Sequence, residues 1–140
     1  QHENEHLDRP SGVRRSLARS RDRFLLDQVV HDRDPGVIRT LLDNPRIVER
    51  DVVRVAAMRP TRPEILRQVT DHPRWSARYP VRLALVCNPY TPVPIAIRLV
   101  STLLLQDLRD LAASAGLAGP VVEAVQHELD GRTRASPGTA

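Results

Sequence analysis

Residues 81–105, VRLALVCNPYTPVPIAIRLVSTLLL, form the most apolar stretch of the chain. Val81–Cys87 carries a single charge, and a helix that is apolar on nearly every side has to be covered by neighbouring elements. Asn88-Pro89 ends that helix, because a residue before proline is disfavoured in the α conformation. Thr91 is suited to cap a second helix that has Pro92 in its first turn. The stretch therefore predicts two buried helices separated by a break. We expect the apolar contacts of the second helix to come from Ile95, Ile97, Leu99, Val100 and Thr102.

The composition favours packed helices in one domain. A chain of 140 residues is large enough for one core, and its hydrophobic fraction is 41% with only 3% aromatic residues. A core of Leu, Val, Ile and Ala suits packed helices better than a β-sandwich. Proline (12 residues) outnumbers glycine (6), so we expect prolines to separate the elements.

Charge and cysteine content limit the possible partners and the cellular compartment. All 21 basic residues are arginines, which we attribute to codon usage in a GC-rich bacterial genome, and the net charge of +4 is compatible with an anionic partner. The only cysteine, Cys87, allows no internal disulfide and no cysteine metal site, which fits the cytoplasm. The longest uncharged run, residues 83–97, is shorter than the roughly 20 residues of a membrane span, and no secretory signal is visible. Because the chain begins with Gln1, we expect it to be processed or a piece of a longer protein.

Prolines and cap signals divide the rest of the chain into short helices. We predict mobile tails over residues 1–12 and 132–140, and a single helical domain over residues 13–131. Asp34 and Thr61 are expected N-caps, the second in a T-x-x-E capping box, and Gly131 is expected to end the last helix. The expected helices begin near Val13, Pro35, Val48, Arg62, Val81, Pro92, Gln106 and Gly119.

The segment His2–His6, HENEH, matches the H-E-x-x-H pattern of zinc peptidases. That chemistry needs a buried helix and a third metal ligand, and no apolar face accompanies the pattern here. We therefore expect a chance match, and we assign no metal ligand, no cofactor and no catalytic residue in the chain.

Four segments share one pattern: a short apolar helix, a two-residue break, a short spacer and a second apolar helix. The breaks fall at Asn44-Pro45, Arg59-Pro60, Asn88-Pro89 and Ala115-Gly116. The last two intervals lie in the range typical of helical repeats, in which short helices are stable only when they stack on their neighbours.

Residues 81–99 carry the pattern V-R-x-A-x-x-x-N-P-x-T-P followed by Leu99. This pattern resembles the leucine-rich repeat variant and, more broadly, the HEAT- and armadillo-like helical repeats. The resemblance covers about residues 35–130, and it implies an all-α, short α-solenoid with an interaction surface. One type of variant-repeat protein carries an iron–sulfur cluster on a cysteine-rich segment. A chain with Cys87 alone lacks that segment, so the cluster is not expected here, and the resemblance supplies no catalytic residue.

Residues 46–82 are the best candidate for a binding surface, because they hold nine Arg and four acidic residues. Arginines four residues apart share a face wherever their segment is helical, and such a face binds anions unless it is an ordinary solvated surface. Trp75 is suited either to stack on a base or to fill a gap between repeats. The candidate partner- or anion-binding residues are Arg50, Arg54, Arg59, Arg62, Arg74, Trp75, Arg78 and Arg82.

The repeat pattern without a credible catalytic set favours a non-enzymatic protein-interaction or scaffold module. One alternative is a nucleic-acid-binding protein that uses the arginines of residues 46–82. A remote alternative is an enzyme similar to the helical-repeat DNA glycosylases, which would need a carboxylate such as Asp71 beside Trp75 in a cleft. Cys87 is expected to be structural rather than nucleophilic. The sequence leaves the oligomeric state open.

Overall fold

The computed structural model describes the backbone of residues 2–135 and the side chains of residues 5–135. All regular structure in this range is helical, so the predicted all-α class is confirmed. The helices of the described range are α1 (His2–Leu7), α2 (Ser11–Leu17), α3 (Arg23–Val29), α4 (Pro35–Leu42), α5 (Glu49–Ala57), α6 (Pro63–Asp71), α7 (Pro73–Ser76), α8 (Tyr79–Cys87), α9 (Val93–Val100), α10 (Leu105–Ala113) and α11 (Gly119–Ala135).

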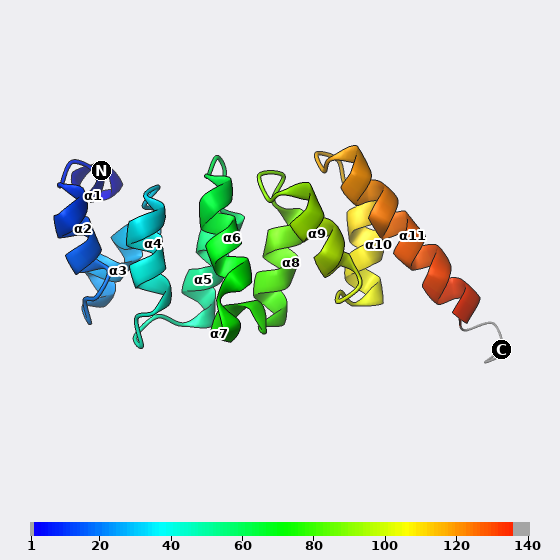
Figure 1. The fold of residues 1–140 in the computed structure, drawn as a ribbon, viewed down its shortest axis with the longest axis horizontal. Helices are drawn as coiled ribbons and strands as arrows, with labels where there is room; N and C mark the ends of the chain where they lie inside the picture. Colours follow the sequence, from blue (N-terminus) through cyan, green and yellow to red (C-terminus); the bar gives the residue numbers. More distant parts are fainter. Residues whose placement is uncertain (1, 136–140) are drawn as a thin grey trace.

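The helices lie side by side along the long axis of the molecule, in two rows (Figure 1). The first row contains α2, α4, α6, α9 and α11, and the second contains α1, α3, α5, α8 and α10. Contacts run along the rows, since α2 packs on α4, α4 on α6 and α9 on α11, while α1 packs on α3 and α5 on α8. The short helix α7 leads from the first row back to the second.

The apolar core forms two clusters that meet in α8. The first extends from Ala18 to Leu85, and the second extends from Val86 to Val125. Leu85 is fully buried, as the sequence predicts for the centre of this helix. The prediction for the following helix is wrong in part: α9 buries Ala96 and Val100, whereas Ile97 is 40% exposed. Thr102 lies beyond the end of α9.

Side chains that follow α4 and α6 satisfy backbone carbonyls at the ends of α2 and α4. The Asn44 amide Nδ2 donates to the carbonyls of Ala18 and Ser20, both at 2.8 Å. The Trp75 indole, 1% exposed, donates to the Leu42 carbonyl at 2.9 Å. The last carbonyls of a helix have no partner within that helix, so these bonds join each helix end to its neighbour.

The predicted start of α4 is confirmed and two other predicted caps are wrong. The Asp34 carboxylate accepts the Gly36 amide at 2.8 Å, with Pro35 in the first position of the helix. By contrast, α6 begins at Pro63 and α9 at Val93, one residue later than the capping signals predict. The Thr91 hydroxyl donates instead to the Leu85 carbonyl at 2.6 Å, near the end of α8, and this carbonyl also accepts the Asn88 amide at 3.3 Å. Thr61 caps no helix.

The N-terminal prediction needs correction. Residues 2–7 form α1 instead of a mobile tail, and the buried His6 ring lies 2.6 Å from the buried Asp32 carboxylate. The single helix predicted over residues 13–32 is two helices, since the Asp22 side chain caps α3 by accepting the Phe24 amide. Phe24 itself is 55% exposed and lies outside the core.

The C-terminal prediction also needs correction. Gly131 does not end α11, which continues to Ala135, so residues 132–135 of the predicted tail are helical. The remainder of that predicted tail, residues 136–140, lies outside the described residues.

Candidate functional site

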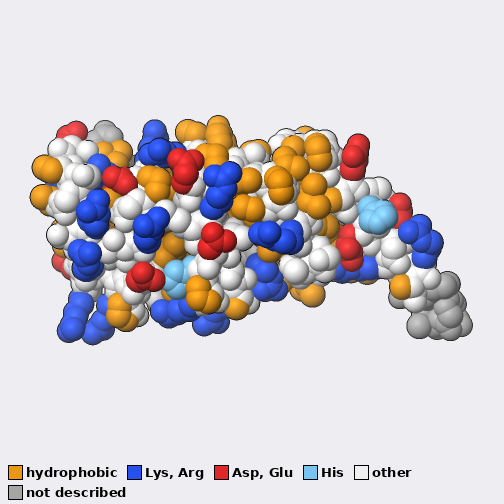
Figure 2. All heavy atoms as spheres, viewed as in Figure 1, with side chains coloured by type: hydrophobic (Ala, Val, Ile, Leu, Met, Phe, Trp, Pro, Cys, Tyr) orange, Lys and Arg blue, Asp and Glu red, His pale blue; other side chains and the backbone are white. Residues whose placement is uncertain are grey.

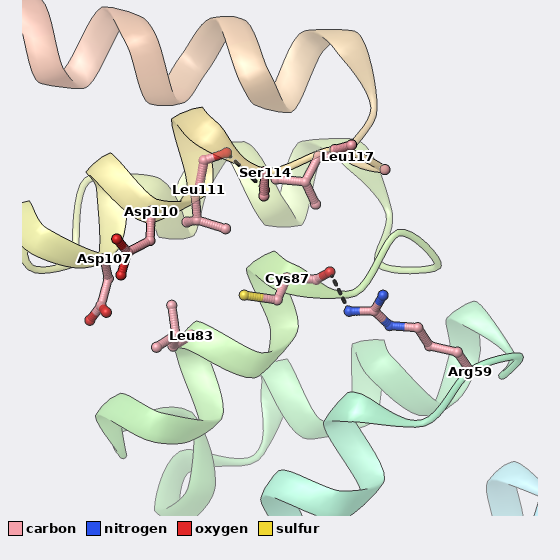
Figure 3. Close-up of a pocket in the computed structure, with 10 residues that line it drawn as sticks. Arg59, Leu83, Cys87, Asp107, Asp110, Leu111, Ser114 and Leu117 are labelled. Carbon is pink, nitrogen blue, oxygen red and sulfur yellow. Dashed lines mark hydrogen bonds between the residues drawn. The ribbon is translucent and has the colours of Figure 1, made fainter.

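A hollow opens between two helices of the second row. α5 packs closely along α8, whereas α10 packs on α11 and makes little contact with α8. The space left between α8 and α10 has a volume of about 370 Å³ (Figure 3). Its lining residues are Arg59, Leu83, Cys87, Asp107, Asp110, Leu111, Ser114, Ala115, Gly116 and Leu117.

The walls of the hollow are apolar. Leu83 of α8 and Leu111 of α10 face each other across it, and Leu117 closes it from the loop before α11 (Figure 3). The Cys87 sulfur points into the space between them. Burial raises the pKa of the Cys87 thiol, the Asp107 charge adds to the rise, and the Arg59 charge opposes it. A thiol that stays protonated at neutral pH is a weak nucleophile, so Cys87 forms part of the wall without being activated.

Charged groups lie at the two ends of the hollow. At one end the Arg59 guanidinium donates to the Cys87 carbonyl at 2.8 Å, which fixes the end of α8. At the other end Asp107 and Asp110 project from the same face of α10 (Figure 3). An apolar space with separated charges at its ends suits a segment that carries both apolar and charged side chains.

Tyr79 ties the acidic end of the hollow to α8. Its hydroxyl donates to Asp107 Oδ2 at 2.6 Å and accepts the Leu104 amide at 2.8 Å. Burial raises the Tyr79 pKa, and the bond to Asp107 raises it further, so the hydroxyl remains a donor. Asp110 accepts the Gln106 side chain at 3.1 Å. In the described part of the chain, neither carboxylate has a basic partner.

Of the predicted binding residues, only Arg59 reaches this hollow. Arg54 bonds Asp27 at 3.2 Å, Arg62 pairs with Glu64 at 3.2 Å, and Arg78 approaches Glu49 at 3.8 Å. Of these three carboxylates only Asp27 lies outside residues 46–82, so pairing with the rest of the molecule removes one charge from the predicted positive excess.

The predicted shared face of Arg74, Arg78 and Arg82 does not form. α7 ends at Ser76 and α8 begins at Tyr79, so Arg74 and Arg82 belong to different helices. Arg82 donates to the Ala77 carbonyl at 2.8 Å and to the Thr102 hydroxyl at 3.1 Å.

Trp75 fills the gap between helices, one of the two roles considered for it. Its ring is buried under the Arg74 guanidinium, which lies 4.2 Å from the ring centre. A ring covered in this way is not accessible to a nucleic-acid base. Asp71 is exposed and lines a separate hollow with His72, whereas the Trp75 ring is buried.

Arg50 is exposed in the first turn of α5. Its guanidinium, like those of Arg46 and Arg67, contacts no carboxylate within the described range. Figure 2 shows basic side chains spread among acidic ones over α2–α8, whereas hydrophobic side chains gather over α9 and the start of α11. The basic groups are thus dispersed over this face and do not form a continuous stripe on it.

The H-E-x-x-H segment shows one of its side chains in an ion cluster. The Asp32 carboxylate that contacts His6 also accepts Arg14 at 2.7 Å. Side chains of residues 1–4 lie outside the described residues. Elsewhere in the described chain, no group of three His, Cys, Asp or Glu side chains is placed to hold a metal ion, and no helix combines the length and the apolar character needed to cross a membrane.

Sequence reasoning missed most of the hollow. Asp107 and Asp110 are three residues apart, which places both on one side of a helix, but this spacing is ordinary for a solvated face. The small extent of the contact between α8 and α10 leaves no mark in either segment, since each has a normal apolar face.

No protein-family model matches the chain, and no curated protein or solved structure matches it either. The geometry of the chain is therefore the guide to its function.

Proposed function

We propose that this chain is a non-enzymatic α-solenoid module that binds a partner protein in the hollow between α8 and α10. The two rows of short helices, joined end to end by side chains such as Asn44 and Trp75, support the solenoid assignment. They are in keeping with the resemblance of residues 81–99 to helical repeats.

The observation that carries the proposal is an apolar space left open between neighbouring helices. α5 and α8 close the preceding gap in the same row by direct packing, while α8 and α10 leave about 370 Å³ accessible. Apolar walls with a few polar groups are characteristic of surfaces that accept the side chains of a partner. Within the hollow the Cys87 thiol has a raised pKa and no basic partner among the described residues, and the Ser114 hydroxyl donates to the Leu111 carbonyl at 2.9 Å, which favours binding over catalysis.

Site-specific photo-crosslinking tests this proposal. A photoreactive amino acid replaces the exposed Ala115 at the rim of the hollow, and the matched variant carries it at the exposed Ala77, between Arg74 and Arg78. In a lysate of the organism that makes the protein, we expect the Ala115 variant to crosslink to one defined protein. The same protein, once purified, should bind the unmodified chain with saturation. Crosslinks that arise only at Ala77, or that disappear on nuclease treatment, would contradict the proposal.

Nucleic-acid binding is a second candidate, favoured by the guanidinium groups of Arg46 and Arg50, which contact no carboxylate of the residues that the structure describes. Phosphate contacts release counterions, so binding of this kind weakens steeply as salt increases. The charge-reversed variant R46E/R50E should then lose retention on single-stranded RNA and DNA. Unchanged retention in this variant, or retention that does not depend on salt, would exclude the candidate.

A further inference from the structure

The molecule contains two helix blocks that match in register. α8, α10 and α11 begin at Tyr79, Leu105 and Gly119, each 56 residues after the starts of α3, α5 and α6. The gap between α8 and α10 can therefore be compared, position by position, with the gap between α3 and α5.

Ion pairs fill the gap between α3 and α5. The Arg23 guanidinium donates to both oxygens of Asp51, at 2.7 and 3.0 Å, and Asp51 is fully buried. Arg54 bonds Asp27 at 3.2 Å across the same gap. Burial disfavours the charge on Arg23, but the two carboxylates outweigh it and raise the Arg23 pKa. Two arginine side chains thus bridge two carboxylates between these helices.

The equivalent gap between α8 and α10 has lost both arginines. Tyr79 stands where Arg23 does, and Leu83 stands where Asp27 does. On α10, Asp107 is equivalent to Asp51, and Asp110 is equivalent to Arg54.

The result is an excess of carboxylates beside an empty volume. Asp107 is held by the Tyr79 hydroxyl through Oδ2, and Asp110 by Gln106 through Oδ1. Within the described residues, the second oxygen of each carboxylate accepts no hydrogen bond. The only arginine lining the hollow, Arg59, bonds the Cys87 carbonyl at the opposite end (Figure 3).

We propose that the hollow between α8 and α10 receives an arginine side chain from a partner protein. Its guanidinium bonds the free oxygens of Asp107 and Asp110, and its methylene groups lie along Leu83 and Leu111. This inference rests on the proposed function and names the group that the partner inserts. The inserted arginine replaces, from outside, the bridge that Arg23 and Arg54 provide between α3 and α5.

The chemistry favours arginine over the other basic side chain. The planar guanidinium presents parallel N–H donors that match two carboxylate oxygens, whereas an ammonium group is a single compact charge. The aliphatic part of arginine also covers apolar surface while its charged end stays at a polar rim. The leucine walls and the acidic end of the hollow fit these two parts in that order.

The test uses three probes and the full chain. The first probe is the peptide acetyl-Gly-Leu-Arg-Leu-Gly-amide. The second has citrulline, which is neutral and close in shape, in place of arginine, and the third is free arginine. Backbone amide chemical shifts, followed by nuclear magnetic resonance, report both the place and the strength of binding.

We expect the arginine peptide to shift the amides of Leu83, Cys87 and Leu111 in a saturable way below about 10 mM, and to bind about tenfold more tightly than the citrulline peptide. D110N should weaken that binding at least about fivefold, while the control E123Q, at an exposed carboxylate on α11, should leave it unchanged. Asp110 is exposed, so D110N should leave the fold intact, and circular dichroism of both variants checks this.

Three results would overturn the inference: equal binding of the citrulline peptide, no effect of D110N, or no shift at these amides. Free arginine binding as tightly as the peptide would also overturn it, because the hollow would then be a small-molecule site. If a partner crosslinks at Ala115 but binds the D110N variant as tightly as the unmodified chain, the arginine site is wrong and the proposed function is retained. Absence of any partner at Ala115 would sink the proposed function itself.

Discussion

Asn88 follows α8 and bonds three backbone groups at once. Its Nδ2 donates to the carbonyls of Ala56 and Met58, at 2.8 and 2.9 Å, and its Oδ1 accepts the Tyr90 amide at 2.9 Å. The side chain is 2% exposed, so water cannot replace these bonds. Asn44 makes the corresponding bonds at the end of α4, to Ala18, Ser20 and the Arg46 amide.

Asn88→Ala should lower the free energy of unfolding by about 2–3 kcal/mol, because it leaves one buried and one partly buried carbonyl without their donor. Urea denaturation followed by circular dichroism measures the change. Gln106→Ala is the control, since its side chain is exposed and makes one bond to Asp110, and it should change the stability by less than about 0.5 kcal/mol. Equal effects of the two substitutions would show that Asn88 does not join the helices.

Tyr79 predicts a loss of stability at alkaline pH. Its pKa is raised above the ordinary 10.0, so the folded state holds the phenol proton more tightly than the unfolded chain does. The stabilisation is complete below pH 10.0 and is lost as the pH rises through the higher pKa of the folded state.

Thermal unfolding between pH 8 and 11 in a Cys87→Ser background measures this effect, because that background removes the Cys87 thiol, whose pKa is also raised. Y79F should flatten the alkaline part of the stability profile relative to Cys87→Ser alone, whereas Y90F, at an exposed tyrosine, should not. A profile that Y79F leaves unchanged would mean that the bond to Asp107 does not stabilise the fold.

At the residue scale, the sequence predicts a cap when the capping side chain and the amide that it binds are neighbours in the sequence. The Asp34 carboxylate accepts the Gly36 amide only two residues later, with Pro35 between them, so the role of this pair was visible. Thr91 was misread because its hydroxyl has a competing acceptor, the Leu85 carbonyl, that becomes available only when α8 ends beside it.

At the scale of elements, two glycines have different backbone conformations, one in a helix and one in a loop. Gly131 lies inside α11, and Gly116 has a φ of 96° in the loop before it. An added Cβ meets nothing within 4 Å at either position, so only the backbone conformation differs.

Gly131→Ala should therefore stabilise the protein by about 0.5–1 kcal/mol, because alanine loses less backbone freedom in a helix. Gly116→Ala should destabilise it by about 1 kcal/mol, because a side chain disfavours the left-handed region. Thermal unfolding of the two variants measures both changes in stability, which should have opposite signs. Destabilisation by Gly131→Ala would indicate that α11 ends at Gly131, as the sequence first suggested.

The breaks between elements were predictable, and their assignment to rows was not. Asn88-Pro89 ends a helix of the second row, as do Arg59-Pro60 and Ala115-Gly116, whereas Asn44-Pro45 ends α4 in the first row. The four breaks were compared as one series although they belong to two rows. This explains why the first interval, from Asn44-Pro45 to Arg59-Pro60, is shorter than the other two. The register of 56 residues between helix starts was hidden, because the equivalent of Asn88 is Asp32, a residue of different type in a different local sequence.

At the scale of the whole molecule, the count of arginines in residues 46–82 was correct, but it did not show which of them are paired with carboxylates elsewhere in the fold. Arg54 is neutralised by Asp27, which lies outside that stretch and becomes its neighbour only because the fold brings α3 beside α5. A linear count of charges cannot include such pairs. Arg59 alone reaches the hollow that we propose as the binding site, and it does so through the backbone of Cys87.

Hydrogen–deuterium exchange of the chain, alone and with the purified partner identified by crosslinking, tests the proposed binding site most directly. The partner should slow amide exchange over residues 83–87 of α8 and residues 107–117, which border the hollow, and should leave residues 46–54 and 74–78 unchanged. Slowed exchange confined to residues 46–54 and 74–78 would place the partner on these arginine-containing segments and contradict binding between α8 and α10.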